Sequence, residues 1–267
     1  MYPYDIISAG TFHIGIYDVC IAFAFVAALV VCDRYLTARK IPNKVINFYL
    51  LTGVAAILLG LFSAELVQSF FNYLKSGIFK LEGMTFYGGL IGGVIVFFII
   101  FFAVGKLLFK EKEHLTYFKD LFEVAPCSIA IAHAIGRIGC LFAGCCYGLE
   151  TGGFPGIRMT VEKAGTSYNG FFLPTQLYEA VFLAILFFIM TLTYNKKYDV
   201  NFIVYLISYG VWRFSIEFLR SDDRGYFIPG LTPAQAISIL FVAVGTALLI
   251  YKIVKDRKKS IIEQEKS

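Results

Sequence analysis

Seven apolar runs follow one another along the chain, separated by short segments that hold most of the charges. Each run is roughly 20 residues long or longer, which is the length that a helix needs to cross the hydrocarbon core of a bilayer. We place the runs near 14–32, 46–72, 86–104, 118–147, 176–194, 200–219 and 231–252. The pattern predicts an all-α, polytopic membrane protein with about seven transmembrane helices, in which residues 1–267 form a single domain.

Lysine and arginine residues gather on one side of this layout, where the positive-inside rule places the cytoplasm. That side holds the loops near 33–45, 105–117 and 195–199 and the tail from Lys252 onward. We therefore expect the amino terminus outside and the carboxyl terminus inside (N-out, C-in). The longest loop, 148–175, then lies outside, and its glycines and prolines favour a small cap or rim on the membrane.

Composition agrees with a membrane protein. Apolar residues make up 58% of the 267 residues and charged residues 16%, so a soluble protein would have to expose large apolar patches. The net charge of +5 does not indicate a nucleic-acid partner, because the basic residues lie in the short loops. The six cysteines form no recognisable disulfide framework. The first apolar run lacks the basic segment of a cleaved signal peptide, so we interpret it as a retained helix.

Several ionisable residues lie inside the predicted spans, where each costs about 2.5–3.5 kcal/mol by insertion scales and marks function by default. The deep ones share a position in the outward half of their spans: Glu65, His133, Arg137, Arg213 and Glu217. The other spans begin, on the same side, with the polar residues Tyr17, Asp18, Tyr87, Gln176, Tyr178 and Glu179. A common depth for so many polar groups predicts a cavity that opens toward the outer leaflet.

Two arginines at this depth suggest an anionic ligand, because the guanidinium group keeps its charge and suits phosphate oxygens. The head group of a phospholipid is the anion most available in the outer leaflet. The alternative is internal pairing, of Arg137 with Glu65 and of Arg213 with Glu217 one helical turn away.

The fourth span holds the densest set of polar residues and glycines: His133, Gly136, Arg137, Gly139, Cys140, Cys145, Cys146 and Gly148. The cysteines allow three interpretations. With His133 they could hold a metal ion, although the paired Cys-x-x-Cys spacing is missing. A Cys–His pair could serve as a nucleophile in acyl transfer. We favour the third, small packing residues at a helix end, and expect neither a metal ion nor a cofactor.

Glycines also open the third span, in the order Gly88-Gly89-Leu90-Ile91-Gly92-Gly93. Such small-xxx-small pairs let two helix backbones approach closely. Contact with a lipid is the other interpretation of this segment.

Four stretches, in this order and spacing, resemble the prolipoprotein diacylglyceryl transferases of bacteria. They are Met84–Gly92, Gly136-Arg137-Ile138-Gly139 with Gly148 following, Pro174–Glu179, and Tyr209–Arg213 leading to Glu217-Phe218-Leu219-Arg220. The resemblance implies transfer of a diacylglyceryl group from phosphatidylglycerol to the lipobox cysteine of a prolipoprotein, with release of glycerol phosphate. It also implies a multi-pass protein of the bacterial plasma membrane, whose partners are phosphatidylglycerol, the prolipoprotein signal peptide and the lipid bilayer.

The resemblance also assigns roles to residues. It implies catalytic roles for Arg137, Arg213 and Tyr87. It implies that the substrates are bound by Tyr17, Gly136, Gly139, Cys140, Cys145, Gly148, Gln176, Tyr209, Glu217 and Arg220.

The chain departs from the family pattern at three of these positions. Tyr87 stands where the family usually has a histidine, Cys140 where it has asparagine, and Cys145 where it has glutamate. A tyrosinate held by two arginines could accept the proton, and His133 could do so if it faces the cavity. Two other functions are compatible with the pattern: a divergent transferase for another lipid or thiol, and a lipid-binding protein without enzymatic activity.

Overall fold

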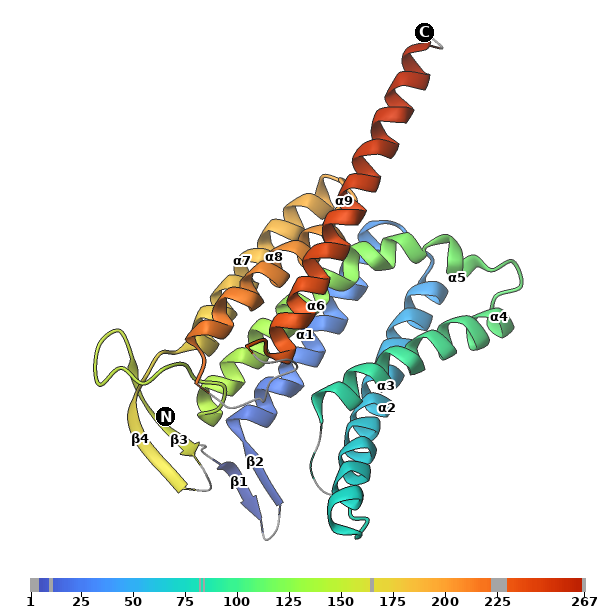
Figure 1. Cartoon of the computed structure of the whole chain (residues 1–267). Coiled ribbons are helices and arrows are strands. Elements are labelled where there is room, and N and C mark those ends of the chain that lie inside the picture. The colour runs from blue at the N-terminus through green and yellow to red at the C-terminus, as the bar shows by residue number, and fades with distance from the viewer. Residues whose placement is uncertain are drawn as a thin grey trace. The chain divides into compact units, whose positions relative to one another are not determined.

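A computed structural model describes residues 5–9, 12–81, 83, 85–163, 166–221 and 230–265. Long helices account for most of these residues (Figure 1). The main helices are α1 (Ile16–Ala38), α2 (Asn43–Ser76), α3 (Phe86–Ile99), α6 (Phe118–Ala143), α7 (Thr175–Asn195), α8 (Asn201–Ile216) and α9 (Pro233–Glu265). A π-helical segment, η1 (Ile100–Val104), joins α3 to α4 (Gly105–Leu108); α5 (Glu113–Thr116) is short, and η2 (Glu217–Leu219) is a 3-10 turn after α8.

Seven helical segments of the described chain are long and apolar enough to cross a membrane. They cover Ile16–Ala38, Asn43–Leu74, Gly88–Leu108, Phe118–Ala143, Thr175–Asn195, Asn201–Leu219 and Pro233–Ile262. The predicted all-α, multi-pass architecture is therefore confirmed. The orientation N-out/C-in, the single domain and the outer-face cap stay predictions.

The observed helices differ from the predicted spans at their ends, and two of these differences bear on the fourth span and on the tail. The fourth span was expected to continue to residue 147, but α6 ends at Ala143, because Gly144 takes the left-handed conformation (φ 65°) that commonly closes a helix. The last span was drawn to residue 252, whereas α9 continues to Glu265. Its final turns carry the basic tail, which a helix can present to water.

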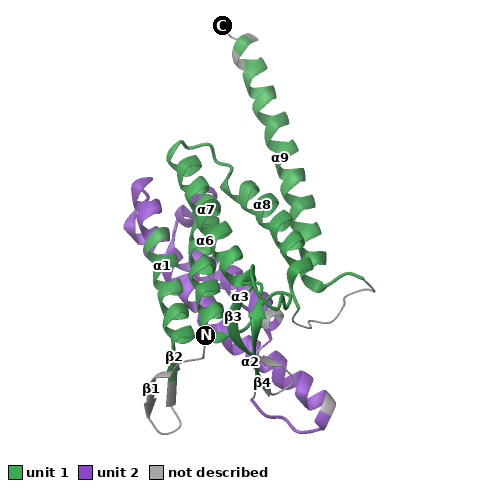
Figure 2. Ribbon diagram, turned by 90° about the vertical axis from the view of Figure 1, so that its left-hand side faces the viewer, with its two compact units in different colours: residues 1–31, 122–267 green, residues 32–121 purple. Residues whose placement is uncertain are grey.

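The chain forms two compact units, one made of residues 1–31 and 122–267 (unit 1) and the other of residues 32–121 (unit 2; Figure 2). In unit 2 the predicted small residues lie between α2 and α3. A Cβ atom at Gly60 would lie 3.0 Å from the carbonyl oxygen of Gly89, and one at Gly92 would lie 2.2 Å from the Oγ of Ser63. The Ser63 hydroxyl donates to the carbonyl of Gly88 at 3.0 Å. The glycines therefore allow the close helix approach expected of them.

An aromatic cluster in unit 2 surrounds His114 of α5, which is 2% exposed. The imidazole ring lies 5.3 Å, centroid to centroid, from the rings of both Phe101 and Phe109, and the hydroxyl of Tyr49 donates to the His114 carbonyl. A Cβ atom at Gly105 would lie 2.6 Å from the imidazole. The cluster fixes the short connection after α4.

Helices α8 and α9 of unit 1 pack closely at Gly210, where a Cβ atom would lie 3.0 Å from the carbonyl oxygen of Ser238. Asn201 ties α8 to two other helices: its backbone N–H donates to Oε2 of Glu123 at 2.8 Å, and its amide donates to the carbonyls of Glu123 (3.1 Å) and Met190 (3.0 Å). Glu123 is 6% exposed. Burial is tolerated because the carboxylate accepts a backbone hydrogen bond.

Two β-hairpins add short strands that the all-α prediction did not include. Strands β1 (Asp5–Ala9) and β2 (Phe12–Gly15) precede α1. The predicted loop 148–175 contains the antiparallel strands β3 (Ile157–Lys163) and β4 (Thr166–Phe172). Their buried side chains pack on residues at and beyond the end of α6, in a cluster of Leu141, Tyr147, Met159, Val161 and Phe172. Packing against α6 gives the two strands an apolar surface to bury.

Candidate active site

The candidate site lies where three helices of unit 1 meet at one end. Arg137 is near the end of α6, Glu179 is near the start of α7, and Arg213 is near the end of α8. The loop that joins α6 to α7 lies at this same end (Figure 1). The shared depth that the sequence predicts for these polar groups is therefore found within unit 1.

Glu179 contacts most of the polar side chains of the site. Its carboxylate accepts hydrogen bonds from Nη2 of Arg137 at 3.2 Å and from the hydroxyl of Tyr209 at 3.1 Å. Nε of Arg137 lies 2.9 Å from its second oxygen. Only 1% of the Glu179 side chain and 12% of the Arg137 side chain is exposed, so the two charges compensate each other away from water.

The imidazole of His133 belongs to the same cluster. Its Nε2 accepts the Nε–H of Arg137 at 3.2 Å and lies 3.7 Å from Glu179 Oε1. A ring that accepts at Nε2 is neutral and carries its proton on Nδ1. His133 thus faces the cluster, as its role as an alternative proton acceptor requires, but Arg137 occupies the lone pair that would take the proton.

Arg213 forms a second ion pair, with Glu217 at 2.9 Å. This is the i, i+4 pairing that the sequence offered as an alternative, and it is confirmed. The carboxylate that Arg137 meets in unit 1 is Glu179, whereas Glu65 belongs to unit 2. Nη1 of Arg213 is buried and donates to none of the residues that the structure describes. Because each arginine has a carboxylate partner, an anion cannot rely on excess positive charge from these two pairs, and Arg213 Nη1 is the donor left to receive it.

Two of the predicted substrate-binding residues hold the backbone that follows α6. The Gln176 amide donates to the carbonyl of Cys145 at 2.5 Å. Gly148 is paired in an antiparallel bridge with Arg220, and a Cβ atom at Gly148 would lie 2.6 Å from the carbonyl oxygen of Leu219. These contacts tie the loop after α6 to the start of α7 and the end of α8.

The predicted glycines of α6 lie against α1. A Cβ atom at Gly139 would lie 3.0 Å from Cβ of Cys20 and 3.3 Å from Cδ2 of Tyr17, and one at Gly136 would lie 3.8 Å from Cδ1 of Ile21. Tyr17 is 40% exposed and so is open to a ligand. The glycines allow α1 to bring Tyr17 next to the signature segment of α6.

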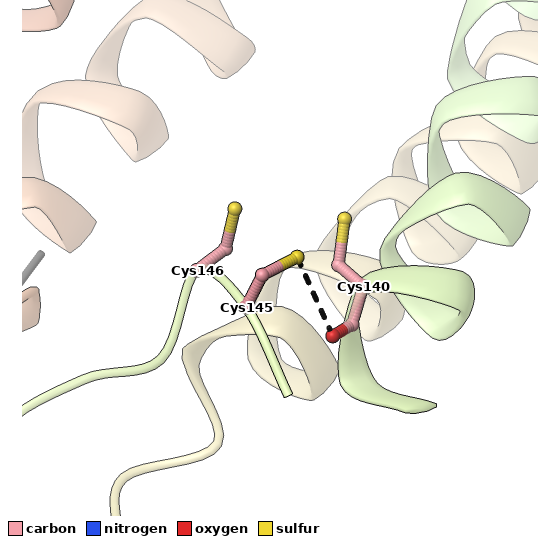
Figure 3. Close-up of side chains that lie close together, drawn as sticks. All are labelled: Cys140, Cys145 and Cys146. Atoms are coloured by element: carbon pink, nitrogen blue, oxygen red, sulfur yellow. Dashed lines mark hydrogen bonds between the residues drawn. The ribbon is translucent and has the colours of Figure 1, made fainter. Parts of the chain in front are cut away.

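Three cysteines converge just beyond the end of α6. The sulfur atoms of Cys140, Cys145 and Cys146 all lie within 4.8 Å of one another (Figure 3). The Cys145 thiol donates to the carbonyl of Cys140 at 3.7 Å. None of the six cysteines, all in the described part of the chain, forms a disulfide bond.

The thiols of the loop differ in acidity. Hydrogen bonds from Cys140 and Cys145, and then the charges of Arg220 and Arg137, lower the pKa of the Cys146 thiol. Hydrogen bonding with Cys140 and Cys146 raises the pKa of Cys145. The nearby positive charges therefore favour the thiolate form of Cys146.

Tyr87 lies in the first turn of α3, in unit 2, and its side chain is outside the described residues. Its catalytic role stays a prediction. Glu179 was counted among the polar residues of the predicted cavity, but no catalytic or binding role was assigned to it, although a carboxylate inside an apolar helix is a signal of function.

Comparison with known proteins adds to this geometry. The family model described as prolipoprotein diacylglyceryl transferase matches residues 5–251. The chain belongs to this family. Its relatives include proteins named phosphatidylglycerol–prolipoprotein diacylglyceryl transferase from Dehalococcoides mccartyi (29% identical, covering 94% of each chain) and Clostridium tetani (30% identical, 91% of this chain and 94% of the relative). A Streptococcus pneumoniae protein of that name is 28% identical over 97% of this chain and 98% of its own. The family resemblance of the motifs is confirmed.

Proposed function

We propose that this member of the prolipoprotein diacylglyceryl transferase family moves a diacylglyceryl group from phosphatidylglycerol to the lipobox cysteine of a prolipoprotein. In this reaction the glycerol carbon exchanges its bond to a phosphate oxygen for a bond to sulfur, and glycerol phosphate leaves. The names of the relatives support this substrate pair. The multi-pass architecture and the bacterial relatives support a place in the bacterial plasma membrane.

The observation that carries the proposal is the buried donor of Arg213. A guanidinium that is already paired with Glu217, and that keeps Nη1 without a partner among the described residues, is positioned to receive a phosphate oxygen. Negative charge grows on that oxygen as the C–O bond breaks, and a fixed hydrogen-bond donor in a site that excludes water stabilises this charge. Arg213 is thus the proposed phosphate-binding catalytic residue.

Arg137 is the second proposed catalytic residue. Glu179 and His133 hold its guanidinium in place, so a phosphate that binds Arg137 must share it with Glu179. Such sharing would loosen the contact with His133 and free the imidazole lone pair. Tyr87 is the other proposed proton acceptor for the substrate thiol, from the family position that usually holds histidine.

The test is a lipidation assay on the full-length protein in micelles that contain phosphatidylglycerol, with a lipobox peptide as acceptor. We expect the peptide to gain the mass of a diacylglyceryl group while an equal amount of glycerol phosphate is released. No mass gain from a folded preparation, under conditions in which the Clostridium tetani relative is active, would refute the proposal. Phospholipid binding without turnover would instead indicate a binding protein.

Arg213→Lys tests the role of the guanidinium fork. Lysine keeps the positive charge beside Glu217 but lacks the planar fork that holds one donor on the carboxylate and directs a second at the phosphate, so we expect a rate about 100-fold lower. The matched control is Arg39→Lys, because Arg39 pairs with Asp120 at 3.1 Å in unit 2 and has no proposed catalytic role. Equal rates for the two variants would contradict the assignment of Arg213.

A further inference from the structure

We propose that Cys140, Cys145 and Cys146 bind one Zn²⁺ ion, whose fourth coordination position takes the thiolate of the substrate cysteine. The metal site follows from the described side chains, and its assignment to the substrate thiol rests on the proposed function. It replaces the expectation, drawn from the sequence, that the chain needs no metal ion.

The sulfur positions suit a thiophilic ion. In Figure 3 the side chains of Cys140 and Cys146 point the same way, and the sulfur of Cys145 lies between theirs. Around a tetrahedral zinc ion, with bonds of about 2.3 Å, the sulfur atoms lie about 3.8 Å from one another. The three sulfurs are at most 4.8 Å apart, so each needs to move inward by about 0.6 Å at the widest spacing.

The backbone that carries the three cysteines is fixed. Cys140 lies in the last turn of α6, and the carbonyls of Cys145 and Cys146 accept hydrogen bonds from Gln176 (2.5 Å) and Thr175 (2.8 Å). Both of these α7 side chains are 1% exposed. The ligands are therefore positioned before an ion arrives, while the cysteines themselves stay partly exposed, so that an ion and a fourth ligand can reach them.

The surrounding charge favours the loaded site. Three thiolates and one Zn²⁺ carry a net charge of −1, which would be costly in apolar surroundings without a counter-charge. The positive charges of Arg220 and Arg137 both act on the sulfur of Cys146. Arg220 therefore offsets part of the negative charge of the loaded site, and Arg137, whose charge is shared with Glu179, joins the metal site to the proposed phosphate site.

Three protein ligands leave one tetrahedral position open, as in catalytic rather than structural zinc sites. A thiol that binds there gives its proton to water and becomes a thiolate, which is the nucleophile that the reaction needs. Its sulfur then forms the bond to the glycerol carbon, and the C–O bond breaks with its electron pair leaving on the phosphate. Zinc is neither oxidised nor reduced. The ion would thus generate the thiolate that the reaction needs.

The experiment is a Cd²⁺ titration of the reduced, full-length protein in micelles without phosphatidylglycerol, followed by the ultraviolet sulfur-to-cadmium absorption. We expect one ion per chain, competed by Zn²⁺ and lost in Cys145→Ser. The matched control Cys32→Ser replaces a cysteine outside the cluster and should bind as the parent does. Because the absorption scales with the number of thiolates, a lipobox peptide should raise it by about a third, and the same peptide with serine for cysteine should not.

Absence of bound ion, or binding that Cys145→Ser leaves unchanged, overturns the metal site. A bound ion whose absorption does not rise with the cysteine peptide overturns its role toward the substrate, as does full lipidation after the metal has been removed with a chelator. The titration contains no phospholipid and involves no turnover, so its result is independent of whether the lipidation assay succeeds. A failure of the inference and a failure of the proposed function are therefore distinguishable.

Discussion

Glu179→Gln removes the negative charge on which Arg137 and Tyr209 converge, and it changes the volume of the side chain very little. The variant leaves the guanidinium of Arg137, 12% exposed, without its carboxylate. Removing one partner of a buried ion pair costs about 3–5 kcal/mol, because the remaining charge stays out of water without compensation. The amide oxygen of glutamine can still accept one of the lost hydrogen bonds, so we expect a loss near 3 kcal/mol.

A double-mutant cycle separates the pair from the rest of the site. Arg137→Gln alone leaves the Glu179 carboxylate buried without its ion-pair partner, whereas the double variant removes both charges. The double variant should therefore lose less stability than the sum of the two single variants, by about 2 kcal/mol. The free energies of unfolding can be measured by reversible SDS denaturation in mixed micelles, followed by circular dichroism.

The matched control is Asp256→Asn in the exposed pair with Lys252, where the charges lie 3.5 Å apart and 62% of the aspartate side chain is in solvent. This substitution should change the free energy of unfolding by less than about 1 kcal/mol. Additive effects of Glu179→Gln and Arg137→Gln, or a Glu179→Gln variant as stable as the parent, would refute the reasoning that the two charges depend on each other.

Three further predictions concern stability in micelles. Asn201→Ala removes the amide that donates to the carbonyls of Glu123 and Met190, so the free energy of unfolding should fall by about 2–3 kcal/mol in SDS denaturation, and an unchanged value would contradict the network. Gly144→Ala should lower the thermal midpoint more than Gly152→Ala. Both glycines have a left-handed backbone, but only a Cβ at Gly144 would meet a carbonyl oxygen of β3, at 2.2 Å. Equal shifts of the midpoint would contradict this reasoning. Burial lowers the pKa of His114, so below about pH 6.5 the unfolded chain binds a proton that the folded chain does not. The thermal midpoint should therefore fall as the pH is lowered through this range, and it should fall less in His114→Gln.

The sequence predicted the transmembrane architecture because the signal is local. The length and hydropathy of a segment suffice to identify a membrane-spanning helix, whatever packs against it. All seven predicted spans overlap the observed helices and differ from them only at their ends. The alternation of Ile157, Met159 and Val161 with polar residues was also a local signal, typical of a strand, and it could have predicted the β3–β4 hairpin.

The partners of the buried charges could not be read in this way. The pair Arg213–Glu217 lies within one helical segment, and its spacing alone predicted it. The partner of Arg137 lies 42 residues further along the chain, and hydropathy does not fix how α6 and α7 rotate toward each other. Helix packing therefore decided that Glu179, and with it His133 and Tyr209, meets Arg137.

The cysteine cluster is a second feature that the sequence did not predict and the tertiary structure decided. The sequence by itself determined a seven-span membrane protein and the motifs of its family, and it predicted a common depth for the polar residues. In a helix that continued to residue 147, Cys140 and Cys145 would point about 140° apart, on different faces. The helix ends instead at Ala143, and the left-handed backbone of Gly144 turns the chain back toward the end of α6. Cys145 and Cys146 therefore lie beside Cys140. Only the tertiary structure decided this, because the turn is held by α7 and β3, which follow later in the chain.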